Sequence, residues 1–255
     1  MMAEGAQLTD VEEVIARLEM LASDSGGRIE LGPNVTDAEM LSWPVTPPTE
    51  LRTLFRRVGG FKLGHYSFDF NHQANHTPVV ADDYYPLRDS STSWVVDDGM
   101  GFSTTFYIDI DAETGEWGRV FSFWRDPYAS LVAPNFLSWL DNLATGMATA
   151  LEKSSGTGGD LSEAFMEWIH ESEESLFRDH HENAVDPVPV ADALASDDTE
   201  MAEVAALLPA EAYLADLREA VYPTEVPFAR FMPIAAYSRF HGGRFLAAAP
   251  LDDED

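Results

Sequence analysis

The chain has 255 residues, of which 45% are hydrophobic and 11% aromatic, enough to form a folded core. It has no cysteine, which excludes a disulfide framework, a thiol nucleophile and a thiolate metal site. Its 15 Lys and Arg residues stand against 45 Asp and Glu residues, and the resulting net charge of −30 disfavours binding to nucleic acid or to anionic membrane.

The negative charge favours a basic protein as partner, because a strong field steers an oppositely charged protein and speeds association. Adaptation to salt, or an acidic proteome in general, is the alternative explanation. Residues 1–8 show no signal peptide, and no apolar run approaches the roughly 20 residues that span a bilayer. We therefore expect a cytoplasmic protein.

Two helix patterns open the chain. A capping box over residues 9–12, with Thr9 as the cap, predicts the first helix, which ends at Gly26 and Gly27. Its apolar face consists of Val11, Val14, Ile15, Leu18 and Leu21. A loop with Pro33, Trp43 and Pro44 follows. The second helix begins at Pro47 and Pro48, ends at Gly59 and Gly60, and carries a stripe of Leu51, Leu54, Phe55 and Val58.

The period then changes from 3.6 to 2, which predicts strands over residues 66–70, 94–96, 105–110 and 117–124. In the third strand Phe106, Ile108 and Ile110 alternate with Thr105, Tyr107 and Asp109. Residues 111–115 have turn chemistry, so the last two strands should form an antiparallel hairpin. A helix opened by Pro134 follows and carries Phe136, Leu140, Leu143, Ala144 and Met147.

This order of elements predicts an α+β fold, with helices packed on a mainly antiparallel twisted sheet, over residues 1–153. Residues 154–159 are typical of a linker. Residues 160–255 are predicted to be acidic and mainly helical, with helices over 161–176, 201–208 and 213–221. A final hairpin over 228–249 would turn at residues 241–243.

The proline-led helix is followed by Trp94, Gly99, Gly101, Tyr107, Asp109 and Gly115, and then by the strand at 120–123 and the helix at 134–140. This order of residues and elements resembles the SUKH superfamily. The resemblance covers roughly residues 8–150. It implies an intracellular protein-binding module, in bacteria commonly one that neutralises a cognate toxin, often a nuclease. The family offers no shared catalytic residues or cofactor to carry over.

Candidate metal and phosphate sites each have a simpler interpretation. Asp109, Asp111 and Glu113 with Gly115 suggest a calcium loop, but an EF-hand needs Gly at the sixth position and Glu at the twelfth, where Thr114 and Val120 stand. A solvated hairpin turn fits better. The histidine pairs His72 with His76 and His180 with His181 are better explained as surface residues, and residues 97–101 as a turn. No catalytic residue, cofactor or metal is expected.

The predicted partner-binding residues combine acidic and aromatic side chains, as interfaces do: Asp82, Asp83, Tyr84, Tyr85, Asp97 and Asp98. An ordinary loop that packs its tyrosines inward is the alternative. The first hypothesis is an immunity protein that occludes a basic, nuclease-type toxin. The second is a cytosolic regulatory scaffold without a toxin partner. The third is a metal-dependent hydrolase using Asp109, Asp111 and a histidine. The sequence does not predict the oligomeric state.

Overall fold

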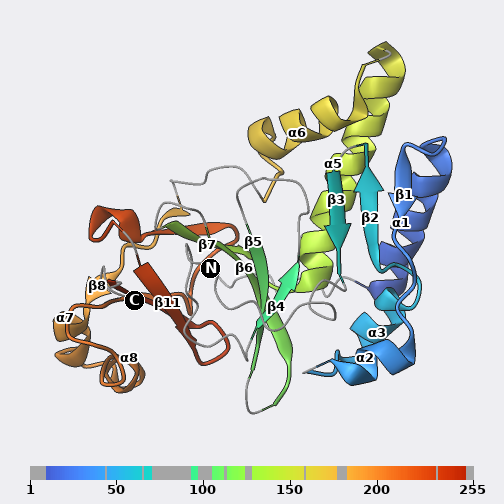
Figure 1. Cartoon of the computed structure of the whole chain (residues 1–255). Helices are drawn as coiled ribbons and strands as arrows, with labels where there is room; N and C mark the ends of the chain where they lie inside the picture. Colours follow the sequence, from blue (N-terminus) through green and yellow to red (C-terminus); the bar gives the residue numbers. More distant parts are fainter. Residues whose placement is uncertain are drawn as a thin grey trace.

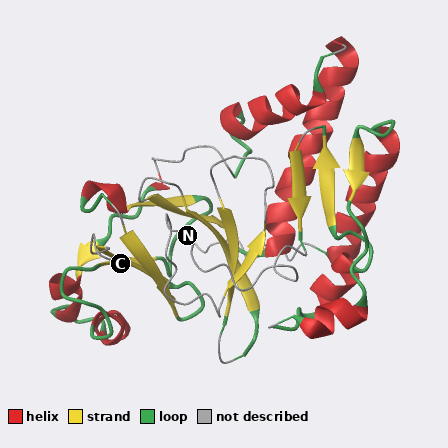
Figure 2. Ribbon diagram, viewed as in Figure 1, coloured by secondary structure: helices red, strands yellow, loops and turns green. Residues whose placement is uncertain are grey.

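The computed structural model describes residues 10–43, 45–64, 66–70, 93–96, 105–111, 114–123, 128–157, 159–176, 183–233 and 235–250. These ranges fold into three antiparallel sheets with helices packed between and outside them, which confirms the predicted α+β class (Figure 2). Five layers follow one another across the molecule (Figure 1). They are a three-stranded sheet, helix α5 (Phe136–Thr157), a central five-stranded sheet, a C-terminal four-stranded sheet, and helices α7 (Val190–Leu194) and α8 (Thr199–Ala205).

The N-terminal part supplies the three-stranded sheet, in the order β1-β2-β3, and three helices. Its elements are α1 (Val11–Asp24), β1 (Ile29–Leu31), α2 (Asp37–Ser42), α3 (Thr49–Phe55), β2 (Gly60–Leu63) and β3 (Tyr66–Asp69). The cap of α1 is Asp10, which accepts a hydrogen bond from the Glu12 backbone at 2.7 Å, so the prediction of Thr9 was wrong by one residue. Helix α2 lies where a loop was predicted, and Thr36 and Glu39 form its capping box.

The central sheet has the order β10-β7-β6-β5-β4 and includes the predicted hairpin. Its first strands and the two helices after them are β4 (Ser93–Val96), β5 (Thr105–Ile110), β6 (Trp117–Phe123), β7 (Tyr128–Ala133), α5 (Phe136–Thr157) and α6 (Leu161–Glu171). Trp139 of α5 lies between Phe68 of the three-stranded sheet and Phe106 of the central sheet, with ring centroids 5.9 and 5.3 Å away. The first core, on this side of the central sheet, therefore joins both sheets to α5.

Residues predicted as a linker continue α5 to Thr157 instead. Ser154 is buried and accepts a hydrogen bond of 2.9 Å from Arg28, so a tertiary contact fixes a segment whose composition favours a flexible connection. Helix α6 begins at Leu161, as predicted, with Asp160 as its cap. Within the described part of the chain, no helix is both long and apolar enough to cross a bilayer.

The remaining residues form a mixed region rather than a mainly helical one. Its elements are β8 (Val188–Pro189), α7 (Val190–Leu194), α8 (Thr199–Ala205), β9 (Tyr213–Asp216), β10 (Thr224–Pro227), η3 (Phe228–Arg230), β11 (Ala235–Phe240) and β12 (Phe245–Pro250). The predicted hairpin is confirmed as β11 and β12. The helix predicted over 213–221 is wrong, because Tyr213–Asp216 is a strand paired with β12. Strand β10 pairs with β7 and so belongs to the central sheet.

Both faces of the central sheet are consequently buried. Phe106 and Ile108 face the first core, while Tyr107 and Phe121 face a second core shared with the C-terminal sheet. The opposite face of the C-terminal sheet carries Leu214 and Phe245 and forms a third core under α7 and α8. The α7–α8 layer therefore has the C-terminal sheet beneath it and exposed side chains on its outer side.

Candidate functional site

A buried ion pair joins the central sheet to the C-terminal sheet. Asp109 of β5 lies 2.8 Å from Arg239 of β11, and the two side chains are only 4% and 2% exposed. On the neighbouring strand, Arg119 donates hydrogen bonds to the backbone oxygens of Leu217 and Gly243 at 2.9 and 3.3 Å. These contacts fix the C-terminal hairpin on the central sheet.

The predicted hairpin turn is present from Asp111 onward, but Asp109 is buried in β5 and is not part of it, which argues against the calcium and hydrolase interpretations. Its carboxylate pairs with Arg239, whereas Asp111 accepts hydrogen bonds of 2.7 and 2.9 Å from the backbone and hydroxyl of Thr114 and so holds the hairpin turn. Glu113 lies outside the described residues. Among the residues that are described, no three potential metal ligands of the His, Cys, Asp and Glu types gather.

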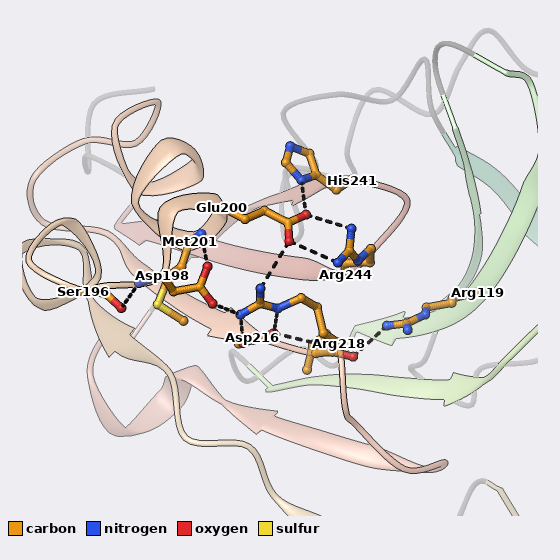
Figure 3. A network of polar contacts seen from close by, with 10 residues as sticks. Arg119, Ser196, Asp198, Glu200, Met201, Asp216, Arg218, His241 and Arg244 are labelled. Atoms are coloured by element: carbon orange, nitrogen blue, oxygen red, sulfur yellow. Dashed lines mark hydrogen bonds and ion pairs between the residues drawn. The ribbon is translucent and has the colours of Figure 1, made fainter. Parts of the chain in front are cut away.

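A network of charged side chains holds α8 against the C-terminal sheet (Figure 3). Arg218, which follows β9, donates to both oxygens of Asp216 at 2.9 and 2.5 Å, and also to Asp198. It reaches Glu200 of α8 at 3.2 Å. Asp198 also accepts from the backbone of Met201 at 3.1 Å as the cap of α8.

Glu200 is the second centre of this network and contacts side chains of the turn between β11 and β12 (Figure 3). Its carboxylate lies 2.8 Å from Arg244 and 2.9 Å from Nδ1 of His241. The guanidinium of Arg218 in addition lies over the ring of Phe245, 4.9 Å from its centroid. One carboxylate from α8 thus meets cations from two segments of the C-terminal sheet.

The network keeps its carboxylates ionised. Hydrogen bonds from Arg218 lower the pKa of Asp216 and of Asp198, and the hydrogen bond to His241 lowers the pKa of Glu200. Hydrogen bonds to Asp216 and Asp198 in turn raise the pKa of Arg218. Groups that exchange protons in catalysis near neutral pH need pKa values close to 7, so this arrangement suits a structural role better than acid–base chemistry. We call this network of Asp198, Glu200, Asp216, Arg218, His241 and Arg244 the clasp.

The clasp leaves the outer side of the α7–α8 layer acidic and partly apolar. Residues 183–217 contain eight acidic residues and no Lys, Arg or His. We define the α7–α8 face as the exposed side chains Asp192, Leu194, Asp197, Glu203, Leu207 and Glu211. None of its four carboxylates has an ion-pair partner within the ranges that the structure describes, and its leucines are 49% and 71% exposed.

A second acidic feature lies on α6 and the turn after it. We define the α6 stripe as the exposed residues Glu163, Glu171, Glu173 and Glu174. The opposite face of α6 is buried against α5, where the ring of Trp168 fills the space beside Gly146. Glu167 lies on the same helix but pairs with Lys153. The stripe has no exposed large hydrophobic residue, so it offers charge without an apolar anchor.

The partner-binding residues predicted from the sequence all lie outside the described residues: Asp82, Asp83, Tyr84, Tyr85, Asp97 and Asp98. The histidines at 72, 76, 180 and 181 lie outside them as well. Sequence reasoning missed the α7–α8 face, although the absence of basic residues over 183–217 was a visible signal. Comparison with protein-family models, with curated proteins and with solved structures finds no match for this chain.

Proposed function

We propose that the chain is a non-enzymatic protein-binding module that captures a basic partner protein on the α7–α8 face. The observation that carries this proposal is the combination of four carboxylates, which have no ion-pair partner among the described residues, with two exposed leucines on a layer that a network of ion pairs and a buried core hold in place. Interfaces need apolar anchors surrounded by polar groups, and electrostatic complementarity adds specificity and association rate. A preformed face loses little conformational freedom on binding.

The use of arginine inside the molecule supports the same proposal. Arg17 pairs with Asp141 between α1 and α5, Arg28 binds Ser154 at the end of α5, and Arg239 is buried on Asp109. Arg119 donates to backbone oxygens of the C-terminal region. Because these arginines make contacts within the chain, they do not offset the exposed carboxylates at the surface. The net charge of −30 therefore attracts a cationic protein surface.

The resemblance to SUKH domains narrows the proposal to an immunity-type protein that acts inside the cell. In this mechanism the carboxylates pair with Arg and Lys side chains that a nuclease toxin uses on phosphate groups, and the toxin is neutralised by occlusion. The α7–α8 face lies beyond the segment of resemblance, which ends near residue 150. It is therefore an addition to the surface predicted around Tyr84 and Asp97.

Binding to the protein encoded beside this gene tests the proposal. The two proteins, purified separately, should form a complex whose Kd rises steeply with NaCl concentration, because screening weakens contacts between exposed charges. The neighbouring protein should also lose nuclease activity when the complex forms. A complex that is insensitive to salt would contradict capture by carboxylates. A complex without any inhibited activity would instead favour the regulatory scaffold.

A further inference from the structure

An exposed aromatic pair lies where the second core reaches the surface. Phe231, just after η3, is 43% exposed, and its ring stacks on Tyr213 with centroids 4.4 Å apart and planes 22° apart. Tyr213 is half-buried and packs against the second core, so one face of Phe231 is supported by a fixed ring. The partial exposure of Phe231 leaves ring surface available to a partner.

The pair lies next to the acidic part of the C-terminal sheet. Tyr213 is opposite Pro189, the cap of α7, in the pairing of β8 with β9, and Glu211 precedes it by two residues. Arg230, the residue before Phe231, forms an ion pair of 2.5 Å with Asp186. The carboxylate offsets the charge of Arg230, which would otherwise repel an approaching cation. Tyr213 faces the second core, on the side of the C-terminal sheet opposite α7 and α8, and the short segment from Glu211 to Tyr213 connects the aromatic pair to the α7–α8 face.

We propose that the Tyr213–Phe231 pair binds an arginine side chain of the basic partner, an inference that rests on the function proposed above. The negative face of an aromatic ring attracts a cation, and a planar guanidinium also stacks on the ring, whereas the ammonium of lysine does not. The chain makes such contacts internally: Arg218 lies over Phe245 at 4.9 Å and Arg119 over Tyr222 at 5.9 Å. The exposed pair extends this chemistry to another protein.

Fluorescein-labelled oligoarginine and oligolysine peptides of equal length, titrated with the full-length chain at low salt, separate this contact from general attraction of charge. Phe231→Leu keeps an apolar side chain but removes the ring. It should weaken oligoarginine binding about two- to five-fold and oligolysine binding clearly less, because the ammonium loses only the attraction to the ring and no stacking. Leu41→Ala, which truncates another exposed hydrophobic residue on α2, is the control and should alter neither. An upfield shift of the arginine side-chain protons by the rings, lost in Phe231→Leu, provides a second measurement.

The outcomes distinguish the two proposals. If both peptides bind the wild-type chain and Phe231→Leu weakens neither, or weakens both equally, the arginine contact is wrong while capture of cations stands. If neither peptide binds the wild-type chain, capture by the acidic surface fails, and the arginine contact fails with it. Circular dichroism of Phe231→Leu that matches the wild type ensures that lost binding does not reflect lost folding.

Discussion

Replacing Arg239 with methionine should destabilise the protein strongly, because it leaves the carboxylate of Asp109 buried without its cation. Both side chains are almost fully buried, at 2% and 4% exposure. Removing one partner of a buried pair typically costs about 3–5 kcal/mol, a large share of the roughly 5–15 kcal/mol that stabilises a domain. The matched control is Arg230→Met, which breaks an exposed pair with Asp186 and should cost less than about 1 kcal/mol.

Urea unfolding followed by tryptophan fluorescence measures both variants. The double variant Asp109→Leu with Arg239→Met removes both charges, and should recover most of the loss because apolar side chains of similar size can replace a buried pair. A loss for Arg239→Met no larger than that for Arg230→Met would refute the reasoning. It would show that the C-terminal sheet does not hold Asp109 out of water as the structure has it.

Two further predictions concern the clasp and the backbone. Arg218→Gln should destabilise the protein at pH 7, and its deficit in unfolding free energy should shrink below about pH 4. The reason is that Asp198, Glu200 and Asp216 have lowered pKa values in the folded protein. Their contribution to stability is present above their ordinary pKa values and is lost as the pH falls through the lowered values. Urea titrations at both pH values check this, and a deficit that grows in acid would contradict it. Gly243→Ala should cost about 1–3 kcal/mol, because Gly243 has φ +76° and a Cβ would lie 2.8 Å from the Phe121 ring. Gly156→Ala near the end of α5 meets nothing within 4 Å and should be neutral or slightly stabilising in the same urea titrations. Equal effects of the two glycine substitutions would refute both assignments.

Local patterns predicted much of the first part of the chain. Helix α1 and the β5–β6 hairpin followed from apolar periodicity and turn chemistry, and α3 from its proline-led stripe. The strand Tyr213–Asp216 was missed because it is buried on both faces, with Leu214 in the third core and Ala215 in the second. Such a strand loses the alternation that identifies strands, and the spacing of its apolar residues then imitated a helix.

Tertiary contacts account for the other differences. The serine- and glycine-rich end of α5 has the composition of a linker, but the hydrogen bonds of Arg28 to Ser154 and Ser155 hold it in place as a helix. Asp109 alternates with apolar residues and so predicts a solvent-facing position, but the C-terminal sheet covers that side. Ion pairs between residues far apart in the sequence, such as Glu200 with Arg244, determine which carboxylates are neutralised. A local sequence pattern does not predict such pairs.

The most direct test of the account compares the salt dependence of Kd for two variants of equal charge, measured with the protein encoded beside the gene. One neutralises the α7–α8 face with Asp192→Asn, Asp197→Asn, Glu203→Gln and Glu211→Gln. The other neutralises the α6 stripe with Glu163→Gln, Glu171→Gln, Glu173→Gln and Glu174→Gln. The account predicts weaker binding and a flatter salt dependence for the first variant, and a result close to wild type for the second. Equal effects of the two variants would contradict a specific face and leave net charge alone as the cause.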